Sequence, residues 1–248
     1  MRVAVVLFCI GFICFSCNES EEEASLTITY KLTFGDDPLP SFSNVSYPAG
    51  YEVFFTKFSL FMSEIGLIGT AEDQSISDVD FIDLLTGIVD SDQALEGVSR
   101  RYSNIKVGEY SGLRFNVGLP AQTNLLKPSD FESDHPLSNT AEYWVGWSSY
   151  IFYKLEGKFD GDSDGEPETN IALHIGSNDA FRQIEITSPF EIREGDNQIE
   201  IVFDLQSILN LDQGYYEFED LPQVHNLTQL PQALPILDNL SSGIVINQ

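Results

Sequence analysis

The chain has 248 residues, with 39 acidic and 12 basic side chains, and its formal net charge at pH 7 is −27. Such a surface repels a phosphate backbone and concentrates cations, so nucleic acid is not an expected partner. The sequence also lacks a Gly-x-Ser-x-Gly elbow, a phosphate-binding glycine loop and a His-Glu-x-x-His pair, so we expect no enzyme.

The N-terminus has the features of a bacterial export signal. An apolar stretch from Val3 to Phe15 is too short to span a bilayer but fits the hydrophobic region of a signal peptide. Ser16 and Cys17 follow it and resemble a lipobox, although Cys14 stands where leucine is usual. We predict a signal peptide over residues 1–16 and lipidation of Cys17, with the protein held at the outer membrane, surface-exposed or facing the periplasm.

Residues 17–24 contain an acidic run that we interpret as a tether, or alternatively as a plain flexible linker. The other two cysteines, Cys9 and Cys14, lie in the predicted signal, so no cysteine is left for a disulfide or a thiolate metal site. A metal would then be held by imidazole, carboxylate, carbonyl, the thioether of Met62 or a modified side chain.

The rest of the chain, residues 25–248, is predicted to be a single all-β domain, an antiparallel sandwich with long loops and at most short helices. Alternating apolar and polar residues predict a strand over Leu26–Phe34, and Tyr51–Ile68 predicts another with a break near Gly66. A short strand is expected over Asp80–Leu84. The polar stretch Ala94–Arg101 is predicted to be a loop or a single turn.

The strand pattern continues on both sides of a long connection from residue 119 to Ser138. Loops of that length tend to be functional or mobile. Short helices are expected over Asp204–Leu209 and Leu227–Leu234. Further strands are expected at four places besides the tryptophan segment at 143–159: Gly108–Gly118, Ile171–Ile175, Phe181–Thr187 and Gln198–Leu205.

Both tryptophans and two of the three histidines lie between Asp134 and Gly176. The segment contains, in order, His-Pro-Leu-Ser at 135–138, Tyr-Trp-Val-Gly-Trp at 143–147, Lys-Leu-Glu-Gly at 154–157 and His-Ile-Gly at 174–176. This order resembles the MbnP-like copper-binding domain family. The resemblance covers about residues 25–248 and implies an MbnP-like β-sandwich. Glu142 departs from the family pattern, in which many members have methionine there and a thioether ligand with it.

The resemblance implies a copper site built from histidines. His135 and His174 occupy the family's His-Pro and His-x-Gly elements, and His225 lies in the C-terminal region where a third family histidine is expected. Copper accepts neutral imidazole, so all three are candidate ligands. The alternative for each is an ordinary histidine, in a turn or on an edge strand, with its ring hydrogen-bonded.

In the family, copper sites are associated with a tryptophan oxidised to kynurenine, which offers donors that unmodified indole lacks. Trp144 and Trp147 are the candidates, and in one strand their side chains would point to opposite faces. We favour Trp144, with core packing as the alternative for either residue. The resemblance implies a dihaem peroxidase-like partner for the oxidation and a TonB-dependent receptor for uptake.

A second metal candidate is the Asp160, Asp162 and Asp164 series, which imitates the first half of a calcium loop. The imitation stops there, because the twelfth position is Ile171 instead of glutamate. The alternative is a polar hairpin tip between strands at 154–159 and 170–175.

Together these observations predict a lipid-anchored surface protein that binds copper for acquisition or storage. The alternative is a metal-free adhesion or interaction sandwich of a surface uptake system, whose aromatic strands serve only the core or a partner face.

Overall fold

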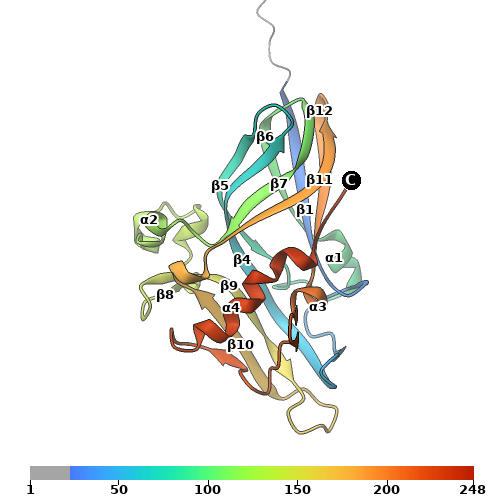
Figure 1. Cartoon of the computed structure of the whole chain (residues 1–248), viewed down its shortest axis with the longest axis vertical. Helices are drawn as coiled ribbons and strands as arrows, with labels where there is room; N and C mark the ends of the chain where they lie inside the picture. Colours follow the sequence, from blue (N-terminus) through green and yellow to red (C-terminus); the bar gives the residue numbers. More distant parts are fainter. Residues whose placement is uncertain (1–22) are drawn as a thin grey trace, which may run out of the picture.

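Two β-sheets pack face to face in the computed structural model, which describes residues 23–248 (Figure 1). In the smaller sheet, β1 is central and pairs in parallel with β12 and antiparallel with β6 and β2. Its strands are β1 (Glu23–Phe34), β2 (Asp37–Pro38), β6 (Val98–Lys106), β12 (Gly195–Asp204) and β16 (Ile244–Asn247). The predicted all-β sandwich is confirmed, with one parallel pair at the centre of this sheet.

The larger sheet is built around β4 (Tyr51–Gly69), the longest strand. Its other strands are β3 (Val45–Tyr47), β5 (Gln74–Asp83), β7 (Gly108–Val117), β8 (Tyr143–Trp144), β9 (Ser149–Phe159), β10 (Thr169–Gly176), β11 (Arg182–Ile192) and β15 (Gln223–Val224). A separate hairpin joins β13 (Asn210–Leu211) and β14 (Gly214–Tyr215).

Strand β4 changes neighbours half-way along its length. Its first half pairs with β9 and its second half with β7, so β7 and β9 follow each other along one edge. Segment 118–148 therefore leaves the sheet at this junction and folds beside β9, where Figure 1 shows α2 and β8 on the same side of the molecule. Gly118 makes the exit possible, because its φ is 95° and a Cβ atom there would lie 2.1 Å from the ring of Phe152.

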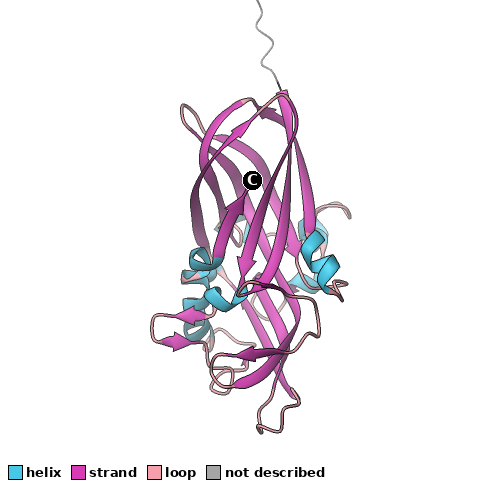
Figure 2. Ribbon diagram, turned by 90° about the vertical axis from the view of Figure 1, so that its right-hand side faces the viewer, coloured by secondary structure: helices cyan, strands magenta, loops and turns pink. Residues whose placement is uncertain are grey.

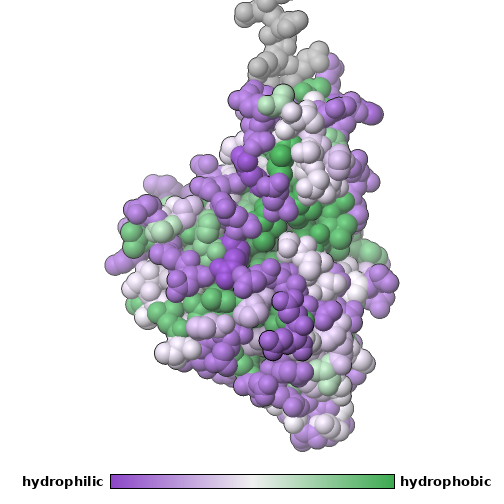
Figure 3. Space-filling model, viewed as in Figure 1, coloured by the Kyte–Doolittle hydropathy of each residue, from purple (hydrophilic) through white to green (hydrophobic). Residues whose placement is uncertain are grey.

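The core lies between the sheets and is rich in aromatic rings. The rings of Phe58 on β4 and Phe203 on β12 lie 5.7 Å apart, so the two sheets touch directly. Along β9, the side chains of Tyr150, Phe152, Tyr153 and Leu155 belong to this core. From Tyr153 onward the side chains alternate, and Lys154, Glu156 and Lys158 lie on the outer face. Figure 3 shows a largely hydrophilic surface on this side of the molecule, with hydrophobic residues gathered toward the middle.

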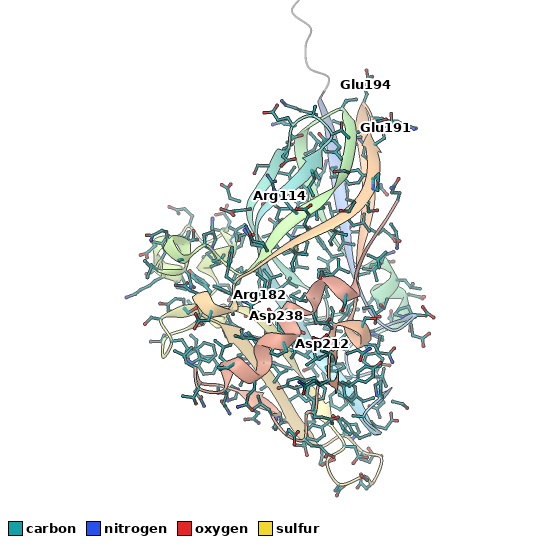
Figure 4. The ribbon with its side chains drawn as sticks, viewed as in Figure 1. Arg114, Arg182, Glu191, Glu194, Asp212 and Asp238 are labelled. Atoms are coloured by element: carbon teal, nitrogen blue, oxygen red, sulfur yellow. The ribbon has the colours of Figure 1, made fainter. Side chains whose placement is uncertain are left out.

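Helices occupy the connections and are short, as predicted. They are α1 (Ser91–Glu96), α2 (Ala121–Asn124), α3 (Leu205–Ile208), α4 (Leu230–Asp238), and the 3-10 turns η1 (Pro128–Asp130), η2 (Pro136–Ser138), η3 (Thr140–Glu142), η4 (Asn178–Ala180) and η5 (Leu240–Gly243). Arg182 of β11 lies beside Asp238 at the end of α4, with Nε and Oδ1 2.5 Å apart (Figure 4). Within residues 23–248, no helix is long and apolar enough to cross a membrane.

Most expected strands are present (Figure 2), and all but β7 and the tryptophan segment are longer than the sequence indicated. The break near Gly66 is a register shift inside a continuous β4. The prediction of a loop or a single turn over Ala94–Arg101 is wrong, because that stretch contains the end of α1 and the beginning of β6. Strand β6 forms by pairing with β1, and its polar residues point outward. The predicted signal peptide and Cys17 lie outside the described residues, whereas Glu23 and Ala24 of the predicted tether already belong to β1.

Candidate metal centre

Three cross-strand rows of side chains cover the outer face of β4, β9, β10 and β15. In the first row, Lys154 of β9 is the register partner of Ser59 and of His174. In the second row, Glu156 lies between Lys57 and Ala172, and in the third, Lys158 lies between Phe54 and Asn170. Strand β15 runs parallel to β10 and ends at Val224, the partner of Leu173, which brings His225 alongside His174. The rows therefore collect imidazole, carboxylate and ammonium groups on a rigid sheet.

The His174 ring is held by Glu156. Its Nε2 lies 2.7 Å from Oε1 of Glu156. This hydrogen bond lowers the pKa of the Glu156 carboxyl by more than partial burial raises it. The nearby charges of Lys154 and Lys57 lower that pKa further. An ionised carboxylate only accepts, so Nε2 donates to it, and in the neutral ring Nδ1 is the nitrogen that keeps the lone pair. Among residues 23–248, this buried Nδ1 atom has no hydrogen-bond partner, so in the neutral ring it is a ready metal donor.

Two more rings complete the cluster. The ring centroids of His174 and His225 are 5.2 Å apart, and that of Trp144 is 5.4 Å from each of them. Burial and the adjacent His174 lower the pKa of His225, so its neutral, metal-binding form is favoured. Metal–nitrogen bonds are about 2.0 Å long, so the two rings lie within the reach of a single ion.

The two tryptophans lie on the same side, and the expectation that they point to opposite faces is wrong. Only Trp144 is in a strand, and the chain then turns back toward β9, with the Trp147 amide donating to the Trp144 carbonyl. The rings consequently stack, with centroids 5.1 Å apart and an interplanar angle of 14°. Gly146 fits under this stack, since a Cβ atom there would lie 3.2 Å from Nε1 of Trp144.

His135 lies elsewhere in the same segment. Its Nδ1 accepts the Leu137 amide at 3.1 Å, and its ring stacks on Phe131 at 4.5 Å. Among residues 23–248, no hydrogen bond or ring contact joins His135 to His174, His225 or either tryptophan. The His-Pro element thus forms a turn, and its role as a ligand stays a prediction.

A buried charge network, which was not expected from the sequence, lies beside the histidines. Nζ of Lys154 is 2.7 Å from Oε2 of Glu142, and both side chains are less than a tenth exposed. Lys57 reaches the same carboxylate at 3.9 Å and Asp83 at 2.6 Å. Burial raises the pKa of Asp83, but hydrogen bonds from Lys57 and Thr86 outweigh it and leave that pKa lowered.

One sequence signal could have indicated this network. Residues 154, 156 and 158 are charged at alternate positions of an otherwise apolar strand, which is the pattern of one polar face. Glu142 gives no such signal, because it lies in a 3-10 turn and meets Lys154 only after the 118–148 segment has folded onto the sheet.

The predicted calcium residues form the hairpin tip between β9 and β10, at the lowest point in Figure 1. Carboxylate oxygens of Asp160, Asp162, Asp164 and Glu168 come within 4.8 Å of one another. Both oxygens of the buried Asp160 already accept amides of the loop itself, those of Ser163, Asp164 and Gly165. The hairpin reading therefore accounts for these contacts, and calcium binding stays a prediction.

Comparison with known proteins agrees with the geometry. A family model described as MbnP matches residues 23–226. The structure is similar to that of MbnP from Methylosinus trichosporium, with a TM-score of 0.60 and 9% sequence identity over 91% of this chain and 98% of that chain. A search of curated proteins found no match.

Proposed function

The chain belongs to the MbnP family, and from this we propose that it binds copper through His174 and His225 for acquisition or storage. The observation that carries the proposal is the buried Nδ1 atom of His174, which has no hydrogen-bond partner in the described part of the chain while the opposite ring nitrogen is held by Glu156. The choice of copper as the metal rests on the family resemblance. Copper of either oxidation state accepts neutral imidazole nitrogen.

The protein's own groups prepare this site in three ways. Glu156 fixes the tautomer and orientation of His174, as carboxylates do beside many metal-bound histidines. The lowered pKa of His225 keeps a second lone pair free of a proton. Trp144 covers both rings. Unmodified indole nitrogen is only a donor of hydrogen bonds, so Trp144 would act as a ligand only after oxidation to kynurenine.

The family resemblance also motivates proposals on partners and location. Oxidation of Trp144 would need a dihaem peroxidase-like protein, and uptake would need a TonB-dependent receptor. We further propose that Cys17 anchors the protein to the outer membrane. The described chain begins at one end of the long axis and the hairpin at 160–168 lies at the other (Figure 1), so an anchored molecule would extend away from the bilayer.

Copper titration of the purified full-length protein tests the proposal, with Cu(I) competition against a chelator and mass spectrometry of the intact chain. We expect one tightly bound copper per chain, lost in His174→Ala and in His225→Ala. His135→Ala is the matched comparison, and we expect it to retain binding because its ring lies outside the cluster. A kynurenine mass gain on the peptide containing Trp144 would support the modified ligand.

The alternative function is a metal-free adhesion or interaction module. Binding weaker than about micromolar in the native protein, with Trp144 unmodified, would favour that alternative. Loss of binding in His135→Ala with retention in His225→Ala would instead contradict the ligand set proposed here.

A further inference from the structure

A trough of about 480 Å³ lies on the outer face of β4, β9 and β10, immediately beside the histidine cluster. Its base is low because Gly157 and Ala172 have small or no side chains. Its walls combine aromatic, amide, cationic and carboxylate groups, and the residues that line it include Phe42, Phe54, Lys158, Asn170, Gln223 and His225. The carboxylate is that of Glu156, which is already held by His174. Copper binding at His174 leaves most of these residues without a function.

Lys158 is the cation of the trough. Its cross-strand neighbours are Phe54 and Asn170, and neither is a carboxylate. Within the described chain, the side chain of Lys158 has no hydrogen bond and no ion pair, whereas Lys31, Lys57 and Lys154 each contact a carboxylate. In a chain with 39 acidic and 12 basic residues, a half-buried lysine without a carboxylate partner is unexpected. Its three donors are available to an anion.

Phe42 forms the aromatic wall in an unusual conformation. Its side chain is 66% exposed and its φ is 62°, a left-handed backbone that bulky residues rarely adopt. The Phe42 amide donates to the Phe55 carbonyl at 3.0 Å, which holds this conformation in place. Its ring lies 5.8 Å from that of Phe54, so two aromatic rings border the trough. Backbone strain that presents an apolar ring to solvent is typical of a binding surface.

We propose that this trough binds a small aromatic carboxylate. The carboxylate would accept charge-assisted hydrogen bonds from Lys158, and the ring would pack against Phe42 and Phe54. Side-chain amides of Asn170 and Gln223 line the same space and can satisfy further polar groups. A neutral sugar would leave Lys158 without a partner, and a polyanion would be repelled by the net charge of −27. A single carboxylate on a planar ring fits both the charge and the shape.

Nuclear magnetic resonance titration of the purified full-length, metal-free protein with benzoate tests the proposal, and benzamide serves as the neutral probe. We expect benzoate to bind with a dissociation constant of about 1 mM or tighter. We expect binding at least tenfold weaker for benzamide, and for benzoate to Lys158→Met or Phe42→Ala, with amide shifts concentrated on residues of the trough. Lys158→Arg should restore binding, and Lys127→Met, which alters a lysine of the 118–148 segment, should leave it unchanged.

Three results would each overturn the proposal: equal affinity for benzamide, unchanged benzoate affinity in Lys158→Met, or amide shifts outside the trough. The absence of binding at a benzoate concentration tenfold above the expected dissociation constant would also overturn it. Thermal unfolding of each variant shows whether a loss of benzoate binding comes from misfolding. If Lys158→Met does not fold, Lys158→Arg still tests whether a cation is needed at this position. The titration uses metal-free protein, so its outcome does not depend on copper binding. Failure of the copper proposal would therefore leave this one standing, and the reverse also holds.

Discussion

At Glu156, one carboxylate oxygen determines which nitrogen of His174 carries the proton. We predict that Glu156→Ala lowers copper affinity about 10- to 100-fold, because the ring loses both its orientation and its fixed tautomer. Chelator competition measures the change. Glu185→Ala removes an exposed carboxylate from another part of the larger sheet and should have no effect. Equal affinities in the two variants would show that Glu156 does not act through His174.

The pair formed by Lys154 and Glu142 tests the energetics of the buried network. We predict that Lys154→Met lowers the free energy of unfolding by about 3–5 kcal/mol, because the buried carboxylate of Glu142 loses its nearest partner. Adding Glu142→Met should recover most of the loss, since the second substitution removes the uncompensated charge. Denaturant unfolding measures both. A double variant no more stable than the single one would contradict this account.

At the scale of elements, the junction of β7 and β9 positions the whole 118–148 segment, including the tryptophan turn. Gly118→Ala should destabilise the protein by at least about 1–3 kcal/mol, because it combines a strained φ with overlap onto Phe152. Gly165→Ala is a matched control: its φ is 93° but nothing lies within 4 Å of the added Cβ atom. The difference between the two unfolding free energies isolates the steric contribution, and similar values would exclude it.

On the outer face of β9, the sequence pattern predicts which residues share the face, and the pairing between strands decides which residues lie next to them. Alternation along β9 predicts that Lys154, Glu156 and Lys158 share one face. Register with β10 and β15 is needed to place the two histidines next to that face. The tryptophan turn was mistaken for strand because the segment's aromatic composition favours strand, whereas the actual turn is held by two backbone hydrogen bonds.

At the scale of the whole molecule, buried tyrosines make stability depend on alkaline pH. Burial raises the pKa of Tyr51 to about 12 and raises the pKa values of Tyr30, Tyr102 and Tyr153 as well. The unfolded chain releases these protons near pH 10 while the folded chain keeps them. We therefore predict that the unfolding free energy is maintained below about pH 10 and falls as pH rises further, as denaturant curves at several pH values would show.

Tyr153 offers a specific check of this origin. Its hydroxyl is buried without a hydrogen-bond partner, whereas that of Tyr150 donates to the Leu137 carbonyl at 2.8 Å. Tyr153→Phe should leave stability at pH 7 unchanged or higher and should reduce the alkaline loss. Tyr150→Phe should instead cost about 1 kcal/mol at pH 7. A destabilised Tyr153→Phe would indicate a partner for that hydroxyl.

The sequence by itself determined the fold class, most strands and the family resemblance, because side-chain alternation and motif order are local properties of the chain. It also identified His174, His225 and Trp144 as candidates. Only the tertiary structure decided which of them meet: β15 brings His225 to His174 from about fifty residues away, and the 118–148 segment brings Trp144 over both while His135 stays apart. Such encounters depend on register and on burial between distant strands, and neither is encoded in the spacing of residues along the chain.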